Sequence, residues 1–212
     1  MSIPSTSAIA DVLALWDEDG WLTPPLSPIV PSRQALLARV LTVRVEVASS
    51  GQGMTPIYDV LSNDLDALVL VIAGAQGVPG AVWGEILTTA ALQQRASGVL
   101  VDGCVRDRPD MQRLGLPVYA RGEHVGGPSN SAHIVEVGCP VTVAGTAISA
   151  DDYIVFDACG CVRIPALRRD QVLDGARRYS AAEELVSLAL AAGEPLSTAY
   201  RHKKIVVDEL RG

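Results

Sequence analysis

The sequence has few aromatic side chains and lacks any long apolar run. Aromatic residues make up 4% of its 212 residues, whereas apolar residues make up 49%. The core must therefore be built mainly from Val, Leu, Ile and Ala. No apolar run approaches the roughly 18 residues of a membrane-spanning helix, and the amino-terminal segment lacks the basic and apolar regions of a signal peptide. We therefore expect a cytoplasmic globular protein with no membrane partner.

Positive charge is also scarce. Lys and Arg total 17 against 24 Asp and Glu, which gives a net charge of −7. Lysine occurs only at Lys203 and Lys204. The basic residues are scattered rather than gathered into a stripe, so the composition argues against a nucleic-acid partner.

Cysteine and histidine provide no recognisable metal or nucleophile motif. The four cysteines lack the spacing of a zinc ribbon or thioredoxin centre, and we expect them to be buried reduced thiols: Cys104, Cys139, Cys159 and Cys161. None of the three histidines lies in a nucleophile elbow, so a catalytic triad is unsupported. His124 follows a predicted strand in a glycine-rich loop, where it either lines a site or is an ordinary surface residue.

Hydrophobic periodicity predicts one α/β domain over residues 1–212 with a mixed central sheet. The predicted helices are Ala8–Trp16, capped by Ser5 or Ser7, then Thr55–Leu61, Ala81–Ser97 with Gly98 in the left-handed conformation at its end, and Arg168–Ala192. The predicted strands are Leu36–Val47, Leu68–Ile72, Val99–Val101, Pro117–Ala120, Ile134–Val137, Val141–Ala144, Tyr153–Phe156 and Val162–Ile164. A proline-rich connector is expected over residues 24–31, and the segment from about 168 to 212 is expected to pack on a neighbouring subunit.

The most informative segment is Val99-Leu-Val-Asp-Gly-Cys-Val-Arg-Asp-Arg-Pro-Asp110, in which an apolar run ends at Asp102-Gly103. Arg106 can bind a carboxylate through two hydrogen bonds, and Asp107 offers the hard oxygen that Mg²⁺ or Mn²⁺ prefers. An ion pair on the surface beside a turn is the alternative. If this strand is parallel to Leu68–Ile72, the motif emerges at the sheet edge where open α/β proteins bind ligands.

A second candidate anion site is Gly84-Glu85-Ile86-Leu87, near the start of a predicted helix. The first backbone N–H groups of a helix have no acceptor within it, and the helix dipole adds partial positive charge there. A carboxylate can therefore be held by backbone alone, with Gly84 permitting close approach. Equally, Gly84 can serve only to let Trp83 pack tightly.

The glycine-rich loop Gly74–Gly80 invites a dinucleotide-binding interpretation. Its spacing is G-x-x-G-x-x-G with a proline inside, whereas the fingerprint is G-x-G-x-x-G. No Lys followed by Ser or Thr completes a phosphate-binding loop. Dinucleotide binding is therefore a minor alternative.

The ordered motifs of the chain resemble those of the RraA-like family, which includes the 4-hydroxy-4-methyl-2-oxoglutarate/4-carboxy-4-hydroxy-2-oxoadipate aldolases. The resemblance lies in Trp83–Leu87, Gly98–Asp107 and Leu116–Arg121, continues through Pro140–Gly145 and Asp152–Pro165, and reaches weakly back to Ser7–Leu13. It implies a compact α/β sandwich related to swivelling β/β/α domains. It also implies homotrimers or homohexamers with active sites between subunits.

The resemblance also implies roles for single residues. In the family's aldolases, an Arg-Asp pair followed after two residues by Glu or Asp marks the active site, and Arg106-Asp107-Arg-Pro-Asp110 fits that pattern. Arg106 would bind the substrate carboxylate, Asp107 would anchor Mg²⁺ or Mn²⁺ directly or through water, and the backbone of Gly84, Glu85, Ile86 and Leu87 would hold the pyruvyl portion. Glu85 and Asp102 are the candidates for holding a proton-transferring water.

The implied activity is metal-dependent cleavage of a 4-hydroxy-2-oxo acid to pyruvate and a second carbonyl product, with oxaloacetate decarboxylation as a related reaction. A metal stabilises the pyruvate enolate, so no Schiff-base lysine is required. The same family includes non-catalytic regulators that inhibit ribonuclease E. These typically lack the Asp of the Arg-Asp pair, so Asp107 favours an enzyme.

Overall fold

The structure is a computed structural model that describes residues 2–23, 25–47 and 53–211. Pro24, the first residue of the predicted connector, lies outside the described residues. The strands are β1 (Ser27–Val30), β2 (Leu36–Val47), β3 (Leu68–Ala73), β4 (Ala81–Trp83), β5 (Gly98–Val105), β6 (Val118–Glu123), β7 (Ala132–Val137), β8 (Val141–Val143), β9 (Thr146–Ile148), β10 (Tyr153–Asp157) and β11 (Gly160–Ile164). The α-helices are α1 (Thr6–Leu15), α2 (Ile57–Val60), α3 (Glu85–Gln93), α4 (Arg108–Leu114), α5 (Arg169–Ala191), α6 (Leu196–Ala199) and α7 (Arg201–Arg211), with short 3₁₀ turns at Ala75–Gly77 and Ala166–Arg168.

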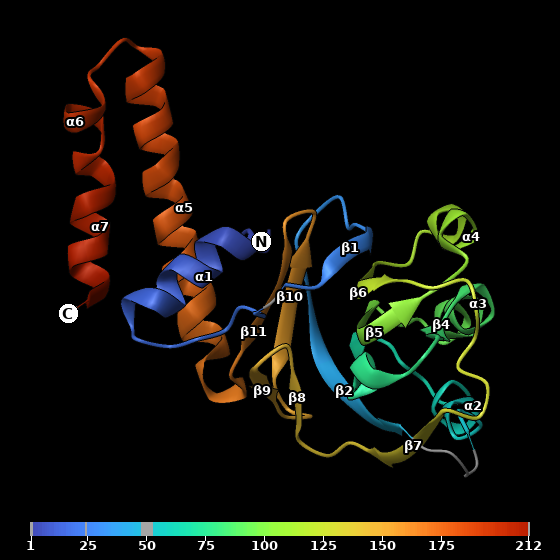
Figure 1. The fold of residues 1–212 in the computed structure, drawn as a ribbon. Helices are drawn as coiled ribbons and strands as arrows, with labels where there is room; N and C mark the ends of the chain where they lie inside the picture. Colours follow the sequence, from blue (N-terminus) through green and yellow to red (C-terminus); the bar gives the residue numbers. More distant parts are fainter. Residues whose placement is uncertain (1, 24, 48–52, 212) are drawn as a thin grey trace.

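The centre of the fold is a mixed sheet, as predicted. Its nine strands follow the order β1-β6-β5-β3-β2-β10-β11, with β4 added beside β5 and β7 beside β2 (Figure 1). The strands β2, β3, β5 and β6 are parallel to one another, whereas β1, β7, β10 and β11 pair antiparallel. Strands β3 and β5 therefore end at the same edge of the sheet.

Strand β3 is covered on both faces, as its continuous apolar run predicts. Leu70 and Ile72 join a core cluster with α2, α3 and α4, whereas Val69 and Val71 join a second cluster that includes the β8–β9 hairpin. A third cluster lies where α1 and α5 cover β10 and β11 (Figure 1). The chain is thus an α/β sandwich around the mixed sheet.

The prediction of one helix over Ala81–Ser97 is wrong at both ends. Ala81–Trp83 is strand β4, which pairs parallel with the end of β5. Its three side chains are buried, a pattern that fits a short buried strand as well as a helix turn. Helix α3 ends at Gln93, and Arg95 rather than Gly98 takes the left-handed conformation.

Strand β5 is longer than predicted. It begins at Gly98, where a Cβ would lie 3.0 Å from the ring of Phe156, and runs through Asp102-Gly103 to Val105. The polar Asp102 and the glycine do not end the strand, because the residues after them still pair on both sides. Cys104 and Val105 pair with β6 on one side and with β4 on the other. Strands β1 and β9 and helices α4, α6 and α7 were not predicted from the sequence, and β1 lies within the segment predicted as a proline-rich connector.

Helices α5, α6 and α7 form a hairpin that projects from the sheet (Figure 1). Helix α7 lies along α5 of its own chain, and the indole Nε1 of Trp16 donates to the backbone oxygen of Leu210 at 2.7 Å. The packing of this hairpin on a neighbouring subunit stays a prediction. Among the described residues, no helix combines the length and apolarity that a bilayer crossing needs.

The cysteines are free thiols, but only Cys161 is buried, and burial raises the pKa of its thiol. Cys159 is exposed, because it lies in the turn between β10 and β11. Cys104 and Cys139 are partly buried. The prediction of buried thiols is therefore right only for Cys161.

A buried tyrosine links distant parts of the sheet. The hydroxyl of Tyr119 donates to the backbone oxygen of Asp157 at 2.6 Å and accepts from the amide of Ser32 at 3.2 Å. Its ring meets Phe156 edge to face. The hydroxyl thus satisfies two backbone groups inside the core.

We predict that Tyr119→Phe lowers the free energy of unfolding by about 1–3 kcal/mol, because the Ser32 amide and the Asp157 carbonyl lose a buried partner. Urea denaturation measures the change. Tyr58→Phe is the matched control, since that side chain is exposed and should change stability by less than about 0.5 kcal/mol. Equal midpoints for the two variants would contradict the structural role of the hydroxyl.

Candidate functional site

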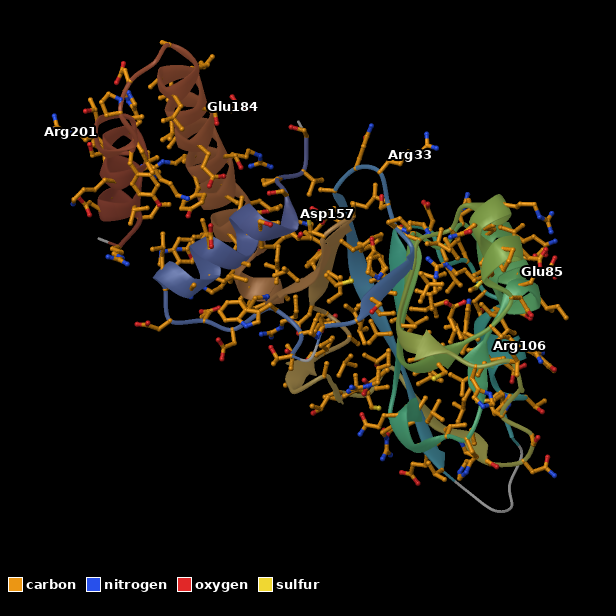
Figure 2. All side chains as sticks on the ribbon, turned by 45° about the horizontal axis from the view of Figure 1, so that its top comes forward. Arg33, Glu85, Arg106, Asp157, Glu184 and Arg201 are labelled. Atoms are coloured by element: carbon orange, nitrogen blue, oxygen red, sulfur yellow. The ribbon has the colours of Figure 1, made fainter. Side chains whose placement is uncertain are left out.

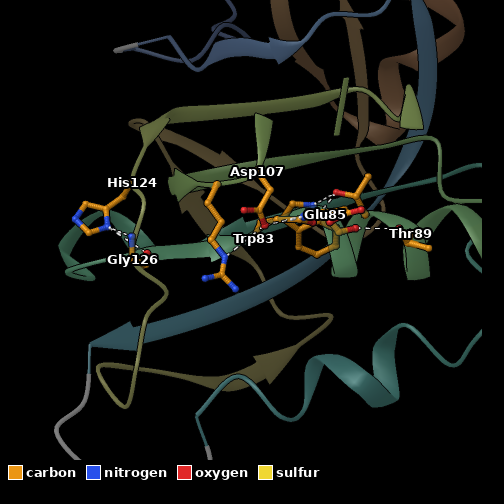
Figure 3. A network of polar contacts seen from close by, with 9 residues as sticks. Trp83, Glu85, Thr89, Asp107, His124 and Gly126 are labelled. Atoms are coloured by element: carbon orange, nitrogen blue, oxygen red, sulfur yellow. Dashed lines mark hydrogen bonds and ion pairs between the residues drawn. The ribbon is translucent and has the colours of Figure 1, made fainter. Parts of the chain in front are cut away.

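A pocket of about 210 Å³ opens where β4 and β5 end and α3 begins. It joins the two candidate segments of the sequence, because both emerge at the same edge of the sheet. Its lining residues are Met54, Ile57, Tyr58, Ala81, Val82, Trp83, Gly84, Glu85, Ile86, Leu87, Arg106, Asp107 and Pro128. Figure 3 shows this region from close by.

Backbone pairing places Arg106 and Asp107 at the pocket. The amide of Arg106 donates to the backbone oxygen of Trp83 at 3.0 Å, which continues the pairing of β4 with β5 past Val105. Asp107 then turns into α4 with φ of 60°, a left-handed conformation that Asp tolerates better than most residues. The Arg106 Nε and Asp107 Oδ2 atoms lie 3.5 Å apart, and the two side chains are 44% and 40% exposed. Both are therefore open to a ligand.

Gly84 allows the two segments to approach each other. A Cβ at this position would lie 2.7 Å from Asp107 Oδ2 and 3.1 Å from Arg106 Cγ. The amide of Glu85 donates to Asp107 Oδ2 at a long 3.4 Å. The absence of a side chain at Gly84 is thus explained by the approach of Arg106 and Asp107.

A buried hydrogen-bond chain holds the start of α3. The indole Nε1 of Trp83 donates to Thr88 Oγ1 at 2.8 Å, and that hydroxyl donates to the backbone oxygen of Gly84, also at 2.8 Å. Trp83 and Thr88 are both fully buried. The orientation of the first α3 amides toward the pocket therefore depends on side chains behind it.

The first turn of α3 carries the other predicted binding residues. Glu85, Ile86 and Leu87 line the pocket together with Gly84. Within the described part of the chain, no hydrogen bond engages the amides of Ile86 and Leu87. These amides and the positive end of the helix dipole can receive a carboxylate.

Asp102 lies away from this pocket. Its carboxylate is 2% exposed and accepts from Arg121 Nε at 2.6 Å, and Arg121 also donates to Gln76. Asp110, the last acidic residue of the motif, pairs with Arg113 along α4. The structure thus brings together Gly84–Leu87 with Arg106 and Asp107, and leaves Asp102 in a separate buried pair.

A second hollow is also lined by Arg106 and Asp107. It is completed by Arg108, Pro109, Glu123, His124 and Val125. Arg108 is paired with Glu123 at 3.1 Å. The Nδ1 atom of His124 lies 3.1 Å from both the amide and the carbonyl oxygen of Gly126 (Figure 3). His124 therefore borders the candidate site, in a position fixed by its own loop.

Sequence reasoning missed the apolar wall of the pocket. Met54, Ile57 and Tyr58 come from the segment around α2, and Pro128 comes from the loop after β6. The loop is held close because the amide of Ala81 donates to the backbone oxygen of Gly126 at 2.9 Å. These contacts join segments distant in the chain, and no local pattern signals them.

Asp107 is the residue best placed to hold a divalent metal. Its Oδ1 atom has no hydrogen-bond partner in residues 2–23, 25–47 and 53–211, whereas Oδ2 faces the Glu85 amide and Arg106. The same residues contain no group of three or more His, Cys, Asp or Glu side chains arranged around a metal position. A magnesium site with one or two protein carboxylates, completed by water and substrate oxygens, fits this donor set.

Comparison with known proteins identifies the family. The profile of the RraA-like family, described as Aldolase/RraA, matches residues 6–163. The chain belongs to the RraA-like family. The match includes every residue of the candidate site and ends before the α5–α7 hairpin.

Two relatives illustrate the range of RraA-like sequences. A candidate 4-hydroxy-4-methyl-2-oxoglutarate aldolase of Halalkalibacterium halodurans is 27% identical over 96% of this chain and 92% of its own. Protein DlpA of Legionella pneumophila is 30% identical over 62% of this chain, but the match spans only 21% of DlpA.

Solved structures share the RraA-like fold. An uncharacterised protein from Pseudomonas syringae pv. tomato has a TM-score of 0.84 at 25% identity, over 93% of this chain and 89% of its own. RraAS2 of Streptomyces coelicolor, described as an unusual member of the RNase ES inhibitor RraA protein family, has a TM-score of 0.75 at 19% identity, over 85% and 89% of the two chains. The fold is therefore that of RraA proteins.

We predict that Thr88→Val lowers the free energy of unfolding by about 1–3 kcal/mol, because the buried Trp83 Nε1 donor loses its acceptor while the side-chain volume is kept. Thermal or urea denaturation gives the measurement. Thr88→Ser keeps the hydroxyl and should lose less stability than Thr88→Val. If Val is tolerated as well as Ser, the hydrogen-bond chain is not what holds the start of α3.

Proposed function

We propose that this protein is a divalent-metal-dependent lyase that cleaves a 4-hydroxy-2-oxo acid to pyruvate and a second carbonyl compound. One observation carries the proposal: Arg106, Asp107 and the amino-terminal end of α3 line a single pocket. These are a carboxylate-binding cation, a metal-binding carboxylate and a set of backbone donors. A 2-oxo acid presents the complementary oxygens.

Arg106 and the α3 amides would bind and orient the substrate. The guanidinium receives the C1 carboxylate through paired hydrogen bonds, while the free amides of Ile86 and Leu87 face the remaining pyruvyl oxygens. Gly127 lies beside the guanidinium, since a Cβ at Gly127 would lie 3.4 Å from the Nη1 atom of Arg106. The carboxylate is thereby held near Asp107.

Asp107 would hold Mg²⁺ or Mn²⁺, directly or through water. When bound, such an ion supplies a Lewis acid that draws negative charge from the oxygens of the 2-oxo acid. The αL backbone of Asp107 and its contact with the Glu85 amide fix the carboxylate at the pocket. Arg106 partly balances the charge of the Asp107 carboxylate.

The proton transfers are assigned to Glu85. Glu85 is the first residue of α3, and its partly buried side chain lines the pocket. It can therefore hold a water that takes the proton of the 4-hydroxyl group and later returns one to C3 of pyruvate. The buried carboxylate of Asp102 is already paired with Arg121. We therefore propose a structural role for Asp102 and not a proton-transferring one.

A Schiff-base mechanism has no support in the lysines of this chain. Lys203 and Lys204 lie on α7, far from the pocket, and pair with Glu183 and Asp208. Although partial burial lowers it, hydrogen bonds to Glu183 and Tyr179 raise the pKa of Lys203 overall. A nucleophilic lysine needs the opposite shift.

The remaining expectations belong to the same proposal. We propose a cytoplasmic homotrimer or homohexamer in which the α5–α7 hairpin contacts a neighbouring subunit. Oxaloacetate decarboxylation would follow from the same enolate chemistry. A ribonuclease-regulating role, as in the RNase ES inhibitor family to which RraAS2 belongs, is the alternative, and the Asp107 carboxylate in the pocket favours the lyase.

The proposal is tested by pyruvate release. The purified chain is incubated with 4-hydroxy-4-methyl-2-oxoglutarate, 4-hydroxy-4-methyl-2-oxopentanoate and oxaloacetate, each with Mg²⁺, with Mn²⁺ and with a chelator. We expect turnover of at least one substrate with metal and its loss with chelator. A folded protein that releases no pyruvate from any of them in a metal-dependent way would exclude the proposed lyase.

Asp107→Asn should reduce kcat/KM at least about 100-fold, because it removes the charge that would hold the metal at the reacting oxygens. Asn tolerates the left-handed backbone at this position, so the melting temperature should change little. Asp208→Asn, in an exposed pair on α7, is the matched control and should keep wild-type activity. A ribonuclease regulator, by contrast, would keep partner binding in Asp107→Asn.

Gly84→Ala should also reduce kcat/KM, about tenfold or more, because the new methyl group would displace Asp107 or Arg106 from ligand-binding geometry. The conformation of Gly84 is ordinary extended backbone, so the effect comes from this contact and not from backbone strain. Gly122→Ala is the control, since a Cβ there meets nothing within 4 Å. Equal kinetics for both variants would show that the approach of the two segments is dispensable.

A further inference from the structure

Two cysteines lie on the wall of another pocket, away from the candidate lyase site. Cys159 and Cys161 both line a pocket of about 190 Å³, whose other walls come from α1, the chain between α1 and β1, and β11. Figure 2 shows Asp157, the last residue of β10, far from Glu85 and Arg106. The two thiols are therefore separate from the residues of the proposed lyase.

The two thiols differ in their access to solvent. Cys159 is exposed in the turn between β10 and β11, whereas Cys161 is 9% exposed and belongs to the core cluster that contains Phe156. Burial and the charge of the Asp157 carboxylate raise the pKa of the Cys161 thiol. Because the thiolate is the reactive form of cysteine, a reagent that arrives from solvent meets Cys159 first. Cys161 is placed to react second, with a partner already bound to Cys159.

The backbone brings the two side chains within reach of each other. Gly160 pairs with Asp157, so Ala158 and Cys159 form a two-residue turn directly before β11. Residues two apart in extended backbone have Cα atoms about 6–7 Å apart and side chains on the same face. This separation lies at the upper end of the Cα range that a disulfide spans. A small movement of the turn is therefore needed to join Cys159 and Cys161.

Gly160 gives the turn room to move, and Asp157 restrains it. The φ of Gly160 is 150°, a conformation that residues with side chains rarely adopt, and a Cβ there would meet nothing within 4 Å. The Asp157 Oδ1 atom accepts from the Cys159 amide at 2.8 Å and from the Thr6 hydroxyl, also at 2.8 Å. Joining the two thiols therefore competes with one hydrogen bond of this carboxylate.

We propose that Cys159 and Cys161 form a reversible disulfide by exchange with a low-molecular-weight disulfide. The Cys159 thiolate attacks one sulfur of the oxidant, the S–S bond of the oxidant breaks, and its other half leaves as a thiolate. The Cys161 thiol then loses its proton to water, and its sulfur attacks that of Cys159. The mixed disulfide breaks and the second half leaves as a thiolate. The protein thereby loses two hydrogen atoms, and the oxidant gains them as two thiols.

The oxidised turn acts on the start of α1. The Asp157 carboxylate also accepts from the amide of Thr6, the first residue of α1, at 2.9 Å. Closure displaces the Cys159 amide from this carboxylate and changes the anchor of the helix. A disulfide at the limit of its span is strained, and strained or exposed disulfides are readily reduced. The thiol pair is thus a modification site that responds to the thiol redox state and acts on α1.

Mass spectrometry after incubation of the folded, full-length protein with oxidised glutathione tests the assignment. We expect a bond between Cys159 and Cys161, with loss of two hydrogen atoms and no bound glutathione. Cys161→Ser should stop at a glutathione adduct on Cys159, and Cys159→Ser should form neither product. Cys139→Ser is the matched control and should react as wild type, because Cys139 does not line this pocket.

Three results would overturn the proposal: a stable glutathione adduct on Cys159 of the wild type, a bond between the Cys159 residues of two chains, or no reaction at all. None of them bears on the lyase, because the two sites share no residue.

Reduction and hydrogen exchange test the strain and its effect on α1. An excess of reduced glutathione should restore both thiols. Amide exchange at Thr6 and Cys159 should be at least about tenfold faster in the oxidised protein, since a hydrogen bond to a charged acceptor is lost or weakened. Cys159→Ser treated with the same oxidant should show no change in exchange at Thr6. A disulfide that resists reduced glutathione, or unchanged exchange on oxidation, would contradict a strained turn coupled to α1.

Discussion

The parallel pairing of β4 with β5 is the interaction on which the candidate site depends. This pairing ends in the hydrogen bond from the Arg106 amide to the Trp83 carbonyl oxygen, and it places Gly84 directly against Asp107. The start of α3 and the turn into α4 therefore face each other across a few ångströms. The buried bond between Trp83 and Thr88 fixes the α3 side of this contact. Neither half would form the candidate pocket alone.

The sheet provides the rigid support for that contact. Strand β3 is buried on both faces, so the parallel strands cannot slip in register without exposing apolar side chains. Arg106 and Asp107 follow the last residue of β5 and are themselves partly exposed. Open, charged groups on buried strands are typical of ligand sites in α/β folds. Apolar side chains of the α2 segment line the same pocket.

The strength of local patterns explains which elements could be predicted. Strand β2 was predicted with the observed bounds, because its alternation of apolar and polar residues reflects one buried face. The sequence predicted either Ser5 or Ser7 as the cap of α1. In the structure Ser5 is the cap, and its hydroxyl accepts a hydrogen bond from the Ala8 amide. Ala81–Trp83 was mistaken for helix because three consecutive apolar residues have no period, and only their pairing with β5 makes them a strand.

The sequence by itself determined the chemistry available at the sheet edge: a guanidinium and a carboxylate after β5, and a glycine before α3. It also determined that Arg106 and Asp107 follow an apolar run, whereas the parallel pairing of that strand with Leu68–Ile72 was only a condition until the structure showed it. The tertiary structure decided which carboxylates are available, because Arg121 takes Asp102 and leaves Asp107 at the pocket. It also brought the α2 segment to the site. The physical reason is that charge pairing and apolar packing act through space between residues far apart in the chain, so no local pattern records their outcome.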